Sequence, residues 1–181
     1  MTKRILVATE GTTDEAVADR LIRRQFPNAM VNFKKFPSRG IDTVIALTPA
    51  IVRAAHFGIY DILVILFDLN GTLKASSSKE PSNSQRWKKI DSLATTTLEV
   101  LAMLPARAHI LRIVYMAPVE STEAWLAWGK NGRAGASWEA MPRWSIKVGL
   151  FGTPPIPTKQ MVLEMADSIL SQMDINIWIS T

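Results

Sequence analysis

Acidic and amide side chains follow three apolar runs of the chain, each at the point where the run ends. They are Glu10 after the run 5–8, Asp68 and Asn70 after the run 62–67, and Glu120 and Glu123 after the run 109–116. In an open parallel sheet the functional crevice lies outside the carboxyl ends of the strands, so we expect these side chains to converge.

Two carboxylates about 4 Å apart repel by roughly 4 kcal/mol at an effective dielectric constant near 20. Such a pair therefore takes up a proton or binds a divalent cation. Oxygen ligands favour Mg²⁺ or Mn²⁺, whose chemistry in proteins is phosphoryl transfer.

Two segments carry a resemblance to a known family. The first reads Ile5-Leu6-Val7-Ala8-Thr9-Glu10-Gly11-Thr12-Thr13-Asp14-Glu15, and the second is a buried run that ends Phe67-Asp68-Leu69-Asn70-Gly71. Together they resemble the toprim domain, and most of all the stand-alone toprim-like proteins related to overcoming-lysogeny-defect nucleases and RloB-type phage-defence proteins. That family has Glu-Gly-x-Thr-Asp/Glu at a strand end and a later Asp-x-Asp. The helical segment 40–60 and Glu120-Ser-Thr-Glu-Ala-Trp125 are also similar to members, so the resemblance covers roughly residues 3–128.

The resemblance implies a role for each acidic position. Glu10 and Asp68 would be the catalytic residues, and the ligands of Mg²⁺ or Mn²⁺ would be Glu10, Asp68, Asn70, Asp14 and Glu123. Asn70 departs from the family, because it stands where the second aspartate of Asp-x-Asp is expected, and an amide weakens metal affinity. The implied activity is that of a nuclease or nuclease subunit that acts on nucleic acid in phage defence, with an ATPase subunit as a partner.

Two other functions stay open. Asn70 is compatible with a non-catalytic interaction subunit whose toprim-like scaffold has a degenerate metal site. The stretch 64–73 also resembles the first motif of haloacid-dehalogenase-type phosphatases, in which Asp68 would be the phosphorylated nucleophile. Against the phosphatase, Asn70 replaces its general acid, a later acidic pair is missing, and two strand–helix units precede a motif that usually opens its domain.

Each motif assigned to the metal site also has a purely structural interpretation. The Thr12–Glu15 spacing is that of a capping box, so these acidic residues could serve only to begin a helix. The segment 68–71 could be a plain turn, and Glu123 could be a solvated side chain on a short helix. A basic rim for nucleic-acid phosphates would comprise Lys34, Lys35, Arg39, Lys74, Arg86 and Lys88, with a solvated surface as the alternative.

Composition narrows the class of protein. The 181 residues carry a net charge of +5 and contain no cysteine, which excludes disulfide scaffolds, thiolate zinc sites and cysteine nucleophiles. An apolar fraction of 48% excludes a disordered chain. No apolar run approaches the roughly 20 residues of a membrane helix, and no targeting segment is visible, so we expect a cytoplasmic protein without membrane contact. A homo-oligomer is left open.

The elements that must position these residues alternate between strands and helices. Strands are predicted at 5–8, 29–36, 61–68 and 109–116, and a C-terminal edge strand at 175–179. Helices are predicted from Thr12, from a cap at Asp42 or Thr48, over 87–101 and 121–128, and after a cap at Thr158. Residues 129–157 show no periodicity. The chain thus predicts one three-layer α/β domain over 1–181, toprim-like with a mostly parallel central sheet, whose core is about 3–128 and whose extension, 129–181, is less regular.

Overall fold

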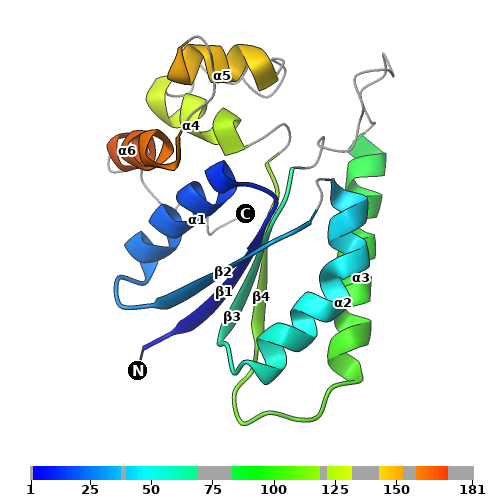
Figure 1. Ribbon diagram of the computed structural model, residues 1–181. Coiled ribbons are helices and arrows are strands. Elements are labelled where there is room, and N and C mark those ends of the chain that lie inside the picture. The colour runs from blue at the N-terminus through cyan, green and yellow to red at the C-terminus, as the bar shows by residue number, and fades with distance from the viewer. Residues whose placement is uncertain are drawn as a thin grey trace.

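A four-stranded sheet, parallel throughout, is the centre of the molecule (Figure 1). The computed structural model describes residues 2–37, 40–68, 83–118, 122–131, 143–152 and 158–170, here called the described residues. The strand order is β2-β1-β3-β4. The strands are β1 (Arg4–Thr9), β2 (Met30–Lys35), β3 (Ile62–Leu66) and β4 (Arg112–Met116).

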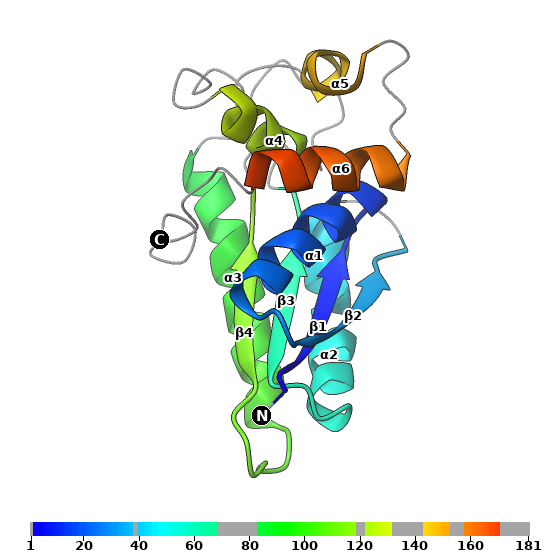
Figure 2. The ribbon, with the colours of Figure 1, turned by 90° about the vertical axis from the view of Figure 1, so that its left-hand side faces the viewer.

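Helices cover both faces of this sheet (Figures 1 and 2). On one face lie α2 (Ile41–Phe57) and α3 (Asn83–Ala102), and on the other lies α1 (Thr12–Gln25). Three further helices, α4 (Thr122–Asn131), α5 (Arg143–Phe151) and α6 (Lys159–Leu170), share an apolar cluster with α1 and gather near the carboxyl ends of the strands. The predicted three-layer α/β fold is confirmed.

The apolar runs of β1 and β3 are explained by burial on two faces. Leu6 and Ala8 of β1 belong to the core cluster of α2 and α3, whereas Ile5 and Val7 belong to the cluster beneath α1. All five residues of β3 are buried. A strand covered on both sides has no polar face, and its sequence is therefore a continuous apolar run.

Most predicted elements lie close to their expected positions. The cap at Thr158 is confirmed, because its hydroxyl oxygen accepts a hydrogen bond from the backbone N–H of Met161 at 3.2 Å. One strand was predicted too long: β4 begins at Arg112, which pairs with Ile62 at the start of β3, and the preceding His109 and Ile110 are exposed.

Two helix starts differ from prediction. Gly11 is the N-cap of α1 without any side-chain cap hydrogen bond, and Thr12 is the first helical residue, so the capping box is not formed. The second helix begins after Gly40, whose φ of 105° suits glycine, and not at Asp42 or Thr48. Thr48 is instead buried inside α2 and its hydroxyl donates to the Val44 carbonyl oxygen at 2.7 Å.

The segment 129–157 shows no periodicity in sequence, so no helix is predicted there, yet Arg143–Phe151 form α5. The predicted edge strand at 175–179 lies outside the described residues. Within the described residues, none of the helices has the length and apolar character needed to cross a membrane.

Candidate functional site

The strand order creates one switch point, between β1 and β3. From β1 the chain passes to β2 on one side, and β3 lies on the other side of β1. In parallel sheets of this kind the crevice at the carboxyl ends of such neighbouring strands is where ligands bind. Glu10 directly follows β1, and Asp68 stands two residues beyond β3.

The register brings these two positions to the same edge of the sheet. Ala8 pairs with Ile65, so continuing the register places Glu10 beside Phe67 and Gly11 beside Asp68. The Phe67 N–H donates to the Met116 carbonyl oxygen at 3.1 Å, which holds the end of β3 against β4. Asp68 is 3% exposed, and Glu10 is half-buried. A carboxylate from each central strand thus lies at the switch point.

Asp14 contributes a further carboxylate, which is buried and lies close to Gly11. It lies in the first turn of α1, where negative charge is favoured by the helix dipole. One of its oxygens accepts a hydrogen bond from the hydroxyl of Thr122, the first residue of α4. The other, Oδ2, lies 3.2 Å from the point that a Cβ atom on Gly11 would occupy. Asp14 therefore links the turn after β1 to the helical layer above the sheet.

Glu123 is fully buried beside Thr122, so the solvated interpretation is wrong. Its Oε1 lies 3.1 Å from Nζ of Lys147 on α5, and the lysine side chain is 22% exposed. An ion pair with so little solvent needs close geometry, because removing two charges from water is costly. Lys147 is a residue that the sequence did not single out.

Lys35 brings positive charge to the same end of the sheet. It ends β2, its Nζ donates to the Thr12 hydroxyl at 3.2 Å, and it lies 3.7 Å from Oε1 of Glu15. Lys34 and Lys88 are exposed. Arg39 and Lys74, like Asn70, lie outside the described residues, and nothing is described of the Arg86 side chain.

The described residues contain no group of three or more histidine or acidic side chains with the geometry of a metal site. The fold places Glu10 and Asp68 at the carboxyl ends of the adjacent strands β1 and β3, and Asp14 and Glu123 contact neighbouring helices. Mg²⁺ commonly takes only one or two protein carboxylates and completes its shell with water and phosphate oxygens. The pair is chemically suited to that role.

No protein-family model matches this chain, and no curated protein matches it in sequence.

Proposed function

We propose that this protein is a Mg²⁺-dependent phosphoryl-transfer protein, a nuclease or nuclease subunit that acts on nucleic acid. One observation supports the proposal above the others: Glu10 and Asp68 follow adjacent parallel strands at the switch point of the sheet. A ligand crevice is expected there on topology alone, and carboxylates are what a hard cation requires. The toprim resemblance adds phage defence as the setting and an ATPase subunit as the partner.

The proposed roles follow from burial and charge. Glu10 and Asp68 would hold Mg²⁺ or Mn²⁺, with Asn70 as a further oxygen ligand. Bound there, the cation would polarise a phosphoryl oxygen and stabilise developing negative charge. Lys34 and Lys88, exposed on β2 and α3, would neutralise backbone phosphates. Asp14 and Glu123 already have partners on α4 and α5, so we assign them to holding the site together.

The test is cleavage of single-stranded DNA, double-stranded DNA and RNA with Mg²⁺ or Mn²⁺, with Mn²⁺ binding followed in parallel by electron paramagnetic resonance. Glu10→Gln and Asp68→Asn keep side-chain shape and remove charge, so each should lower the cleavage rate by about 100-fold or more. Glu99→Gln and Asp91→Asn make the same changes at exposed positions of α3 and should leave the rate unchanged. Equal rates in all five proteins would eliminate the site.

A non-catalytic interaction subunit is the second candidate. It is favoured by the Glu123–Lys147 ion pair, which engages one expected ligand, and by the missing three-carboxylate group among the described residues. Asn70→Asp separates the two candidates, since it restores the family's second aspartate. Tighter Mn²⁺ binding in Asn70→Asp would support a weakened metal site, whereas no binding in either protein would support the scaffold.

A further inference from the structure

Four exposed apolar residues lie on segments at the end of the sheet opposite the candidate site. They occupy the last residue of α2, the turn into β3, the residue after α3 and the approach to β4, all at the lower end of Figure 1. We call them the basal patch: Phe57, Ile59, Met103 and Ile110, exposed by 64%, 61%, 69% and 86%. The two loops that carry them are joined, because Nη2 of Arg107 donates to the Tyr60 carbonyl oxygen at 3.1 Å.

Ile59 has a backbone conformation that its residue type disfavours. Its φ is +56°, in the left-handed region, where a β-branched side chain crowds the backbone. It follows the C-cap of α2 in a Schellman motif: its N–H donates to the His56 carbonyl oxygen at 3.2 Å, and the Tyr60 N–H donates to that of Ala55 at 3.1 Å. Glycine is the usual residue at that position.

The neighbouring glycine does not relieve this strain. Gly58 has an ordinary φ of −74°. A Cβ atom there would lie 2.6 Å from the Tyr60 ring and 2.7 Å from the Ala54 carbonyl oxygen, so close packing requires glycine at this position. Folding alone would favour a second glycine at Ile59. Instead the position carries a strained, exposed apolar side chain, which indicates a contact made outside this chain.

The charged residues near the basal patch indicate which charge the surface of a binding partner carries. In the segments 53–62 and 99–112, which carry the patch, and at the start of β1, which pairs with the start of β3, the cationic residues are Lys3, Arg4, Arg53, Arg107 and Arg112, and the acidic residues are Asp61 and Glu99. The Asp61 carboxylate already accepts the Arg4 N–H at 2.8 Å. Arg53 is exposed one helical turn before Phe57, so both lie on one face of α2. An apolar centre with a positive rim complements an apolar segment flanked by acidic residues.

We propose that the basal patch is a docking surface for a partner protein that presents an acidic amphipathic segment. The patch lies at the other end of the strands from Glu10 and Asp68, so docking leaves the candidate site open. The inference does not depend on the proposed function.

Ile59→Gly is the informative variant, because it separates folding from docking. It relieves the left-handed strain and should raise the melting temperature by about 2–4 °C. The probe is a fluorescein-labelled helical peptide of about five turns, with leucine on one face and glutamate elsewhere, compared with a peptide that has lysine in place of glutamate. In anisotropy titrations, the wild type should bind the glutamate peptide about tenfold or more tightly than the lysine peptide. Ile59→Gly should weaken that binding about tenfold.

Leu98→Ser is the matched control, since Leu98 is 66% exposed on α3 but outside the patch, and it should not change binding. The docking proposal is overturned if Ile59→Gly leaves binding unchanged or if both peptides bind equally. It is also overturned if wild type forms a concentration-dependent dimer in sedimentation velocity that Ile59→Gly abolishes, which would assign the patch to a second copy. Nucleic-acid cleavage should be the same in Ile59→Gly and wild type. A failure of the docking proposal can therefore be told apart from a failure of the proposed nuclease function.

Discussion

The hydroxyl of Thr122 donates a hydrogen bond to the buried carboxylate of Asp14, across 108 positions of sequence. Asp14 lies in the first turn of α1, which follows the turn that carries Glu10, and Thr122 is the first residue of α4. The bond joins the first turn of α1 to the start of α4, in addition to the apolar cluster that these helices share. A hydrogen bond to a charged, buried acceptor contributes more than one between neutral groups.

Thr122→Val should therefore destabilise the fold by about 1.5–3 kcal/mol, because it keeps the side-chain shape but leaves the Asp14 carboxylate without this donor. The measurement is urea denaturation followed by circular dichroism. Thr122→Ser keeps the hydroxyl and should recover most of the loss. Thr95→Val, at an exposed position of α3, should stay within about 0.5 kcal/mol of wild type. A Thr122→Val protein as stable as Thr95→Val would contradict the role given to this bond.

The buried Glu123–Lys147 pair should be more sensitive to the loss of one partner than to the loss of both. Lys147→Met removes the cation beside a fully buried carboxylate and should cost about 3–5 kcal/mol. Adding Glu123→Gln removes the buried negative charge, so the double variant should be more stable than Lys147→Met alone. Both are compared by urea denaturation at neutral pH.

The control for that experiment is the exposed pair of Lys89 and Asp42, whose charged atoms lie 3.2 Å apart. Lys89→Met should cost less than about 1 kcal/mol, because solvent already screens both charges. If Lys147→Met costs no more than Lys89→Met, the buried pair does not hold α5 to α4.

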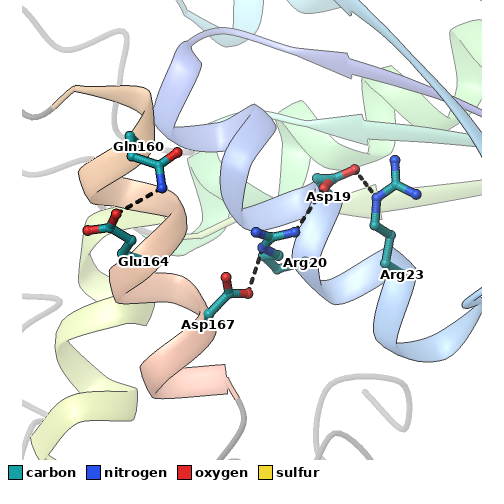
Figure 3. Close-up of polar contacts among 6 residues, drawn as sticks. All are labelled: Asp19, Arg20, Arg23, Gln160, Glu164 and Asp167. Carbon is teal, nitrogen blue, oxygen red and sulfur yellow. Dashed lines mark hydrogen bonds and ion pairs between the residues drawn. The ribbon is translucent and has the colours of Figure 1, made fainter.

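Helix α6 is attached to α1 by apolar contacts more than by its ion pair. Nε of Arg20 lies 2.6 Å from Oδ1 of Asp167, but the two side chains are 31% and 55% exposed (Figure 3). Asp167→Asn should therefore cost less than about 1 kcal/mol, and less still in 1 M salt, where the screening length is about 3 Å. Val162→Ala, at a position 1% exposed, should cost about 1.5–3 kcal/mol. Urea denaturation of the two variants measures which one loses more free energy of unfolding. A larger loss in Asp167→Asn than in Val162→Ala would show that the ion pair is the stronger attachment.

The sheet could be predicted from sequence because the continuous apolar runs of its central strands indicate burial on both faces. The apolar run 62–67 suits only a strand covered on both faces, and β3 is that strand. Helix α5 could not be predicted, because its apolar residues mark no single stripe at helical spacing; they are Trp144, Ile146, Val148 and Leu150. Only Ile146 and Leu150, four apart, are buried, so tertiary contacts decide the helix.

Only those features of the candidate site that follow from the direction of the strands could be predicted from the sequence. The carboxyl ends of parallel strands share one edge, so strand direction places Glu10 and Asp68 at the same edge of the sheet. The partners of the other acidic residues lie far along the chain, and nothing local indicates them. Asp14 has the position of a helix-start residue, yet its partner is on α4, and Glu123 pairs with a lysine on the unpredicted α5.

Tyr115 on β4 should make the fold sensitive to alkaline pH. Its hydroxyl donates to the Thr97 hydroxyl oxygen at 2.7 Å, and Thr97 in turn donates to the Leu93 carbonyl oxygen at 2.9 Å. Burial raises the pKa of the Tyr115 phenol above its ordinary value, and the hydrogen bond with Thr97 offsets part of that rise. The folded protein therefore holds this proton more tightly than the unfolded chain.

The sign of the pH dependence follows. The contribution of Tyr115 is fully present below the unfolded pKa of about 10 and is lost as pH rises through the folded value, because the unfolded chain then binds fewer protons. The free energy of unfolding should fall as pH rises above about 10 in wild type, and fall less steeply in Tyr115→Phe. At pH 7 the same variant should lose about 1 kcal/mol, since Thr97 keeps its Leu93 partner. Urea denaturation across this range measures both effects, with Tyr60→Phe as the variant of the second tyrosine. An alkaline slope that is identical in wild type and Tyr115→Phe would show that this phenol titrates alike in the folded and unfolded chain.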